Sequence, residues 1–167
     1  HRRRLLAEQR RDRRALLHER IERPEVLIGS TYKIKSPLVE HAFYVTINDM
    51  VLNAGTAHEQ RRPFEIFINS KNMEHYAWTV ALTRMISAVF RRGGDVSFVV
   101  EELKAVFDPR GGAWIGGAYV PSILAAIGGV IERHMIAIGF LSGEGAGLKA
   151  DPHAGGGSAP AGPSCPA

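Results

Sequence analysis

The chain has 167 residues, of which 45% are hydrophobic and 23% are charged, and it contains one cysteine. This length suits one ordinary domain with extensions and excludes a large catalytic barrel. The single cysteine, Cys165, excludes an internal disulfide framework and is compatible with a reducing, cytoplasmic compartment.

Positive charge is concentrated at the N-terminus. Residues 1–23 contain nine arginines against four acidic residues, a net charge of +5, whereas the rest of the chain has a net charge of −1. Residues 1–22 lack glycine and proline, which predicts a basic helix, and their sparse leucines predict that this helix needs a partner. We expect this arm to face a protein partner, and any contact with phosphates to be nonspecific and sensitive to salt.

Three patterns then predict an antiparallel meander. Alternating polar and apolar residues over 31–35 and over 42–52 predict two half-buried strands. The apolar run 64–68 predicts a third strand that is either central or well covered. The polar segment 53–62 between them predicts a loop.

Helical periodicity follows. Residues 75–92 predict a core helix ended by two glycines, and Met73 and Met85 are assigned to the core. Asp95 predicts the N-cap of a second helix over 96–107. After a glycine-rich loop, Pro121 and Ser122 predict the start of a third helix that ends near residue 140.

These elements predict one α+β domain over residues 24–140, a small antiparallel three-stranded sheet packed by about three helices. The C-terminal segment 141–167 differs in composition, because 17 of its 27 residues are Gly, Ala or Pro, and this predicts a disordered, flexible linker. Its composition predicts a reach of about 25–30 Å. The residues expected to be buried are Phe43, Val45, Ile47, Phe64, Ile66, Leu82, Ile86 and Leu103.

Few residues suggest chemistry by their spacing. His41, His58, His75 and His134 lack the spacing of metal ligands, so we interpret them as ordinary surface or core residues. The segment Arg110-Gly111-Gly112 is a candidate anion-binding loop, with a plain connection between helices as the alternative. No enzyme active site is visible in the spacing of residues.

Several ordered blocks resemble a known family. The blocks are 31–35 (TYKIK), 44–48 (YVTIN), 62–68 (RPFEIFI), 69–78 (NSKNMEHYAW), 81–94 (ALTRMISAVFRRGG) and 108–112 (DPRGG). Together they resemble the TSCPD domain of adenosylcobalamin-dependent (class II) ribonucleotide reductases, in the version that forms a separate small subunit. The resemblance covers about residues 23–138.

This resemblance implies a non-catalytic accessory subunit or C-terminal domain that supports the reduction of ribonucleotides to deoxyribonucleotides through a tethered cysteine tail. It implies a catalytic class II subunit as partner, with adenosylcobalamin bound to that subunit. In the family a flexible tail is often followed by a zinc-binding knuckle that opens Cys-Pro-x-Cys, beside cysteines that shuttle reducing equivalents. Cys165-Pro166-Ala167 is similar to its first three positions, which implies a metal or redox role for Cys165, zinc in the complete tail, further cysteines after Ala167, and a thioredoxin-type reductant.

Two other classes of function remain open from the residues. One is an α+β module whose basic arm binds nucleic acid or an acidic protein, although the nearly neutral body disfavours nucleic acid. The other is a structural oligomerisation domain. No segment of the sequence predicts a membrane span, because charged residues interrupt the most apolar helix.

Overall fold

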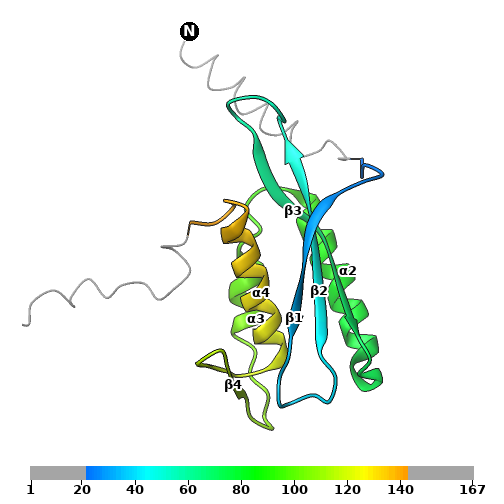
Figure 1. The fold of residues 1–167 in the computed structure, drawn as a ribbon, viewed down its shortest axis with the longest axis vertical. Helices are drawn as coiled ribbons and strands as arrows, with labels where there is room; N and C mark the ends of the chain where they lie inside the picture. The colour runs from blue at the N-terminus through cyan, green and yellow to red at the C-terminus, as the bar shows by residue number, and fades with distance from the viewer. Residues whose placement is uncertain (1–21, 143–167) are drawn as a thin grey trace, which may run out of the picture.

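The computed structural model of the protein describes residues 22–142. The elements are β1 (Ile28–Ile34), β2 (Phe43–Leu52), β3 (Gln60–Ser70), η1 (Met73–His75), α2 (Tyr76–Arg92), α3 (Phe98–Lys104), β4 (Ala113–Ile115), β5 (Ala118–Val120) and α4 (Ile123–Ala137) (Figure 1). This is an α+β fold, as predicted. The helix expected over 1–22, apart from its last residue, and nearly all of the tail expected over 141–167 lie outside the described residues.

The main sheet is an antiparallel meander in the order β1-β2-β3. On β2, Phe43, Val45 and Ile47 alternate toward the core and are fully buried. β3 is an edge strand, yet it is well covered, because α2 packs along it. Ser87 of α2 accepts a hydrogen bond from the Ile66 N–H and donates one to the Ile66 carbonyl oxygen, so the helix satisfies backbone groups that an edge strand leaves free.

β1 begins three residues before the predicted strand, and the added residues include Gly29. Gly29 pairs with Asn48 across the sheet. A Cβ atom at this position would collide with the carbonyl oxygen of Ile47, so the close approach of the two strands requires glycine. Gly29 therefore belongs to the strand itself.

The second predicted helix is shorter than expected. It was predicted over 96–107 with Asp95 as its N-cap, whereas α3 spans only Phe98–Lys104 and its N-cap residue is Ser97. The Asp95 carboxylate instead accepts hydrogen bonds from the backbone N–H and the hydroxyl of Ser97, at 3.0 and 2.6 Å. These local bonds form a turn that precedes the helix.

The glycine-rich segment after α3 is a hairpin and not a loop. β4 and β5 pair in antiparallel register. Gly116 and Gly117 form their connection with φ values of 60° and 82°, the conformation that a two-residue hairpin turn requires. A pair of glycines between short strands was therefore the signal that the sequence interpretation missed.

α4 begins where it was predicted. The Ser122 hydroxyl accepts a hydrogen bond from the Ala125 N–H at 3.0 Å, as an N-cap does, and donates one to the Val106 carbonyl oxygen at 2.6 Å. The helix ends at Ala137, where Gly139 adopts a φ of 78° and the Phe140 N–H bonds back to the Met135 carbonyl oxygen.

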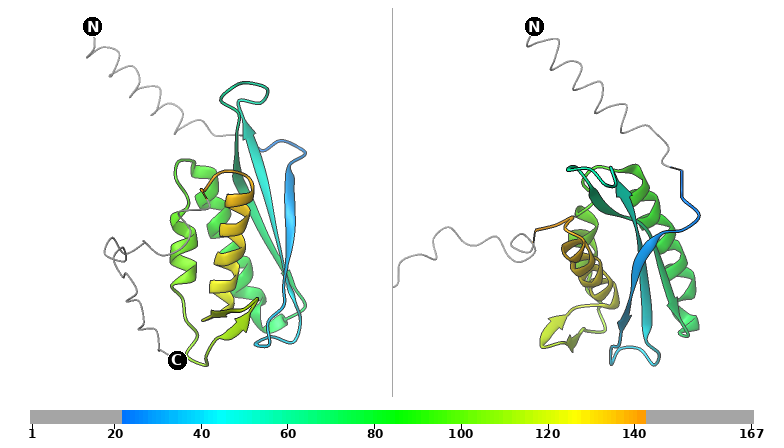
Figure 2. Two further views of the ribbon diagram at one scale, coloured as in Figure 1. Left: turned by 60° about the vertical axis from the view of Figure 1, so that its left-hand side comes forward. Right: turned by 45° about the horizontal axis from the view of Figure 1, so that its top comes forward.

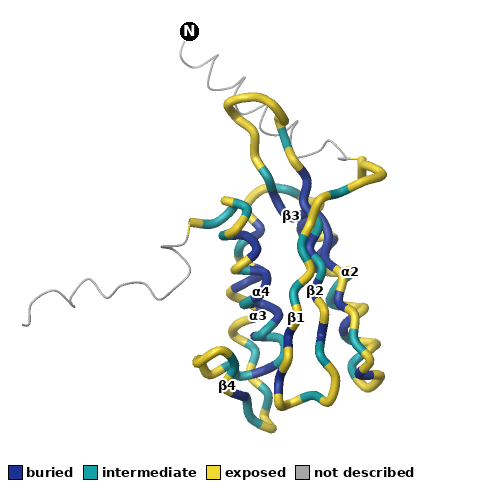
Figure 3. Tube along the Cα trace, viewed as in Figure 1, coloured by how far each residue is buried: buried dark blue, intermediate teal, exposed yellow. Residues whose placement is uncertain are grey.

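The core lies between the sheet and the helices. α4 packs on α3 and against β1 and β2, and Figure 2 shows α3 and α4 on one side of the sheet. Buried residues follow these facing surfaces (Figure 3). Seven of the eight residues predicted to be buried are so, and Leu82 is partly buried.

The assignment of two methionines to the core is wrong. Met73 and Met85 are 77% and 67% exposed. The buried stripe of α2 consists of Thr79, Ile86, Ser87 and Phe90, so Met85 lies off the face that packs against β3. Thr79 and Ser87 can occupy that buried face because their hydroxyls donate hydrogen bonds to backbone carbonyl oxygens.

Candidate functional site

A groove of about 580 Å³ opens at the end of the molecule where α2 and α4 begin. Four segments form it: the β1–β2 connection, the start of α2, the connection from α3 to β4, and the start of α4. Its walls are mainly apolar. The apolar residues that line it include Leu38, Trp78, Leu82, Met85, Phe107 and Ile123.

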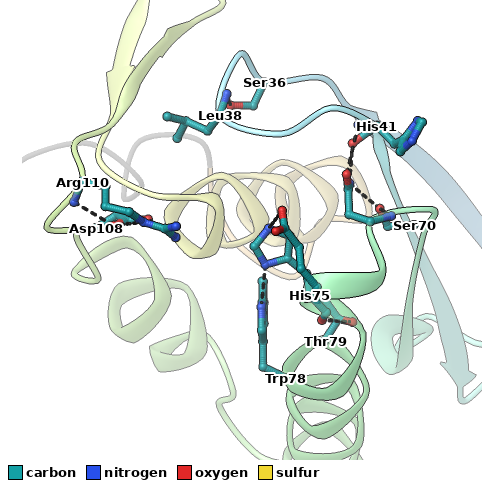
Figure 4. A network of polar contacts seen from close by, with 11 residues as sticks. Ser36, Leu38, His41, Ser70, His75, Trp78, Thr79, Asp108 and Arg110 are labelled. Carbon is teal, nitrogen blue, oxygen red and sulfur yellow. Dashed lines mark hydrogen bonds and ion pairs between the residues drawn. The ribbon is translucent and has the colours of Figure 1, made fainter.

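His75 and Trp78 form a fixed pair in one wall of the groove. The Trp78 indole N–H donates a hydrogen bond to His75 Nδ1 at 2.9 Å, and His75 Nε2 lies 3.2 Å from a carboxylate oxygen of Glu74. Since Nδ1 accepts, the ring proton is on Nε2, facing Glu74. The Thr79 hydroxyl donates to the His75 carbonyl oxygen at 2.8 Å, which further holds this turn. In Figure 4 the pair of His75 and Trp78 lies between Arg110 on one side and His41 of the β1–β2 connection on the other.

Asn72 holds the β1–β2 connection in place beside this wall. Its side-chain amide accepts a hydrogen bond from the His41 N–H at 3.1 Å and donates to the His41 carbonyl oxygen at 2.6 Å (Figure 4). It also donates to the Ser70 hydroxyl at 2.6 Å. Asn72 is buried, and its role was missed because nothing in the sequence pattern identifies its distant partner.

The predicted anion loop lies at the opposite rim of the groove. The Arg110 N–H and guanidinium both bond to Asp108, and these hydrogen bonds lower the pKa of Asp108 and raise that of Arg110. The Gly111 N–H donates to the Asp108 carbonyl oxygen, and the Gly112 N–H donates to the Tyr119 hydroxyl. An incoming anion would have to compete with these partners for both N–H groups and for Arg110.

A second polar cluster is buried between β2 and α4. His134 Nε2 lies 2.7 Å from Asp49 Oδ1, and the Tyr32 hydroxyl lies 2.8 Å from His134 Nδ1. Arg61 donates to the other oxygen of Asp49 at 3.0 Å. Sequence analysis missed this cluster, although Asp49 falls on the same alternation as Phe43, Val45 and Ile47, so a carboxylate at a buried strand position was a usable signal.

The chemistry of the groove suits the binding of another molecule. Its apolar walls suit an apolar segment of another molecule, with the Glu74–His75 contact and the Asp108–Arg110 ion pair at its rim. Within residues 22–142, no three His, Cys, Asp or Glu side chains come together as metal ligands would. None of the helices in that range is long and apolar enough to cross a membrane. Cys165 lies outside the described residues.

Comparison with family models identifies the class of protein. Residues 13–135 match the model of the TSCPD domain, so the chain belongs to the TSCPD domain family. This domain is found in class II ribonucleotide reductases. No curated protein and no solved structure gave a significant match to the chain. The match covers all four segments that form the groove.

Proposed function

We propose that this protein is an accessory component of a vitamin B12-dependent (class II) ribonucleotide reductase. The match to the TSCPD domain over residues 13–135 carries this proposal. In this function a separate catalytic subunit binds adenosylcobalamin and reduces the ribonucleotide, in the cytoplasm, to supply deoxyribonucleotides for DNA replication. The present chain binds that subunit and serves its redox cycle.

The groove supports the binding part of this proposal. Its lining residues from Glu74 to Met85 and from Asp108 to Arg110 belong to sequence blocks that resemble the family. Phe107 and Met85 are 72% and 67% exposed, although both are large and apolar. Because apolar surface gains free energy when it leaves water, these residues favour contact with an apolar segment of the catalytic subunit.

Cys165 supplies the redox part. Thiol–disulfide exchange requires contact between sulfur atoms: the Cys165 thiolate attacks one sulfur of an oxidised pair and forms a mixed disulfide, while the other sulfur leaves as a thiolate. A second thiol must then release the mixed disulfide, and we assign it to one of the further cysteines expected after Ala167 or to a thioredoxin-type reductant. The reach of about 25–30 Å predicted from the composition of the tail suits delivery to a distant site. Zinc is proposed only for a complete cysteine knuckle.

The experiment combines the full chain with a class II catalytic subunit, adenosylcobalamin, and thioredoxin with its reductase. Met85→Glu with Phe107→Glu places charge in the groove and should weaken binding to the subunit by tenfold or more, since burial of an unpaired charge is costly. Phe98→Glu is the matched control, because Phe98 is 52% exposed and does not line the groove. Equal binding by both variants would contradict the assignment of the groove.

Cys165→Ser tests the redox part separately. This variant should bind the subunit as the wild type does and permit a single turnover, but reduce the rate of multiple turnover. Unchanged multiple turnover would show that Cys165 is not the carrier. If the wild-type chain neither bound the subunit nor changed its activity, the accessory function itself would be wrong.

A further inference from the structure

The outer face of the sheet, opposite α3 and α4, carries exposed aromatic residues in a regular arrangement. The strand register places Lys33, Tyr44 and Asn69 in one row across the three strands, and Thr31, Thr46 and Phe67 in the next row. Tyr44 is 43% exposed and Phe67 is 47% exposed. They are diagonal neighbours on adjacent strands, about 7–8 Å apart, so the face presents two neighbouring aromatic rings.

Two exposed lysines lie beside these rings. Lys33 lies opposite Tyr44 on β1 and is exposed, and Lys71 is exposed just after β3. The buried Glu65 lies on the same face, but Arg23 pairs with both of its oxygens, at 2.9 and 3.0 Å. Glu40 is the exposed acidic residue in the β1–β2 connection. The face therefore offers cations beside its aromatic rings, while its buried carboxylate is already neutralised.

A pocket of about 470 Å³, lined mostly by residues with polar groups, lies beside Tyr44 and Asn69. His41, Tyr44, Asn69, Ser70 and Lys71 line it, together with Ala42. An asparagine side chain offers both a donor and an acceptor, which suits the edge of an unpaired base, and a lysine ammonium suits a phosphate. An aromatic ring at the border of the pocket supplies the surface on which a base stacks.

Arg23, near the start of the described residues, is bound to this same face. Arg23 is the last of the nine arginines in residues 1–23, and its guanidinium binds Glu65, which pairs with Asn48 in the row next to Thr46 and Phe67. Charge alone indicated only nonspecific contact with phosphates, and the rings add a means to recognise unpaired bases.

We propose that the outer face of the sheet is a binding site for single-stranded nucleic acid. Bases stack on Tyr44 and Phe67, and Lys33 and Lys71 contact phosphates. This combination of stacking rings and cations along a backbone path is the general chemistry by which proteins hold single strands. The site is separate from the groove, so this inference goes beyond the proposed accessory function and does not depend on it.

The test measures binding of the full chain to a fluorescein-labelled oligo(dT) of 12 nucleotides by anisotropy, beside a 12-base-pair duplex. We expect the single strand to bind at least tenfold more tightly than the duplex. Tyr44→Ala and Phe67→Ala should each weaken binding about fivefold or more, because each removes a stacking surface. Trp114→Ala is the matched control, since Trp114 is 72% exposed on the β4–β5 hairpin, and it should leave the affinity unchanged.

Salt dependence tests the lysines. Lys33→Ala combined with Lys71→Ala should lower the slope of log affinity against log salt by about 1.4, from about 0.7 for each phosphate contact on a single strand. All substituted side chains are exposed, and circular dichroism verifies that each variant is folded.

Four results would overturn the proposal. The first is unchanged affinity in the Tyr44→Ala/Phe67→Ala double variant, which would assign binding to the arginines alone. The second is equal affinity for duplex and single strand. The third is displacement of the oligonucleotide by an equimolar mononucleotide, which would identify a nucleotide site. The absence of binding at low salt would also contradict it.

Discussion

Asp49 on β2 and Glu65 on β3 are both paired with arginine, yet they serve opposite faces of the same sheet. The Asp49 side chain is fully buried and faces His134, which is 1% exposed, on the inner side. The Glu65 side chain is 5% exposed and binds Arg23, which is 47% exposed, on the outer side. Asp49 thus connects the sheet to α4, whereas Glu65 connects it to the start of the described chain.

The polar contacts on the inner side of the sheet should therefore contribute more to the free energy of unfolding than those on the outer side. Asp49, His134, Tyr32 and Arg61 form a chain of hydrogen bonds in which two members have almost no contact with water. In that environment a group left without its partner cannot turn to solvent. Arg23 can turn to solvent if it loses its partner, because about half of its side chain is already hydrated.

The largest effect is expected for Asp49→Ala. Removing this carboxylate leaves the buried His134 and part of Arg61 without an acceptor, and breaking such a pair costs about 3–5 kcal/mol. Urea unfolding should show a lower midpoint with an unchanged slope. Glu102→Ala, at an exposed position of α3, is the control and should change the free energy of unfolding by less than about 0.5 kcal/mol. A loss below about 1 kcal/mol in Asp49→Ala would remove the contrast between the two faces.

A smaller loss is expected for Glu65→Gln. The amide keeps the shape and one acceptor but loses the charge-assisted pair of bonds from Arg23, at a cost of about 1–2 kcal/mol. The same unfolding measurement applies. If Glu65→Gln destabilised the protein as strongly as Asp49→Ala, burial of the partner would not be the deciding factor.

Tyr32→Phe should have a still smaller effect. The change removes the hydroxyl beside His134 Nδ1, and the loss of one hydrogen bond costs about 1 kcal/mol. The ring itself stays, and with it the contact with Arg133, whose guanidinium carbon lies 5.8 Å from the ring centroid. The thermal midpoint should fall slightly, and the near-ultraviolet circular dichroism should stay native-like. A gain in stability would mean that the hydroxyl is not part of the buried chain.

The stability that Glu65 contributes should depend on pH. The hydrogen bond from Arg23 lowers the pKa of Glu65, with a further lowering from Asn48 against the opposite effect of burial. A carboxylate with a lowered pKa in the folded state adds stability above its unfolded pKa, about 4.3, and loses it as pH falls through the folded pKa. The difference in unfolding free energy between wild type and Glu65→Gln should therefore be constant from pH 7 to about 5.5 and shrink progressively below that. A difference that grew on acidification would contradict the cause assigned to this pKa.

Much of the secondary structure followed from local patterns. Alternation located β2, a change to helical spacing located α2, and Ser122 marked the start of α4. The predictions were wrong at glycines, because a glycine can end an element or lie within a strand or a hairpin turn. Gly29 lies inside a strand, and Gly116-Gly117 connects two strands, although glycines in a sequence also mark breaks.

The candidate site was less predictable than the fold. Arg110 was singled out, but its partner is Asp108, and the groove beside it joins segments that lie far apart in the chain. Trp78 and His75 are close in sequence, yet their hydrogen bond depends on the turn that precedes α2. Sequence resemblance identified the family without locating this surface.

By itself, the sequence determined the α+β class, the positions of the main elements and membership of the TSCPD family, because periodicity and ordered blocks are local properties. Only the tertiary structure decided that β3 is an edge strand covered by α2, that Asp49 meets His134, and that Tyr44 and Phe67 share one face. The physical reason is that these features depend on the register and packing of distant segments. Each residue alone is compatible with several partners, and the fold selects one.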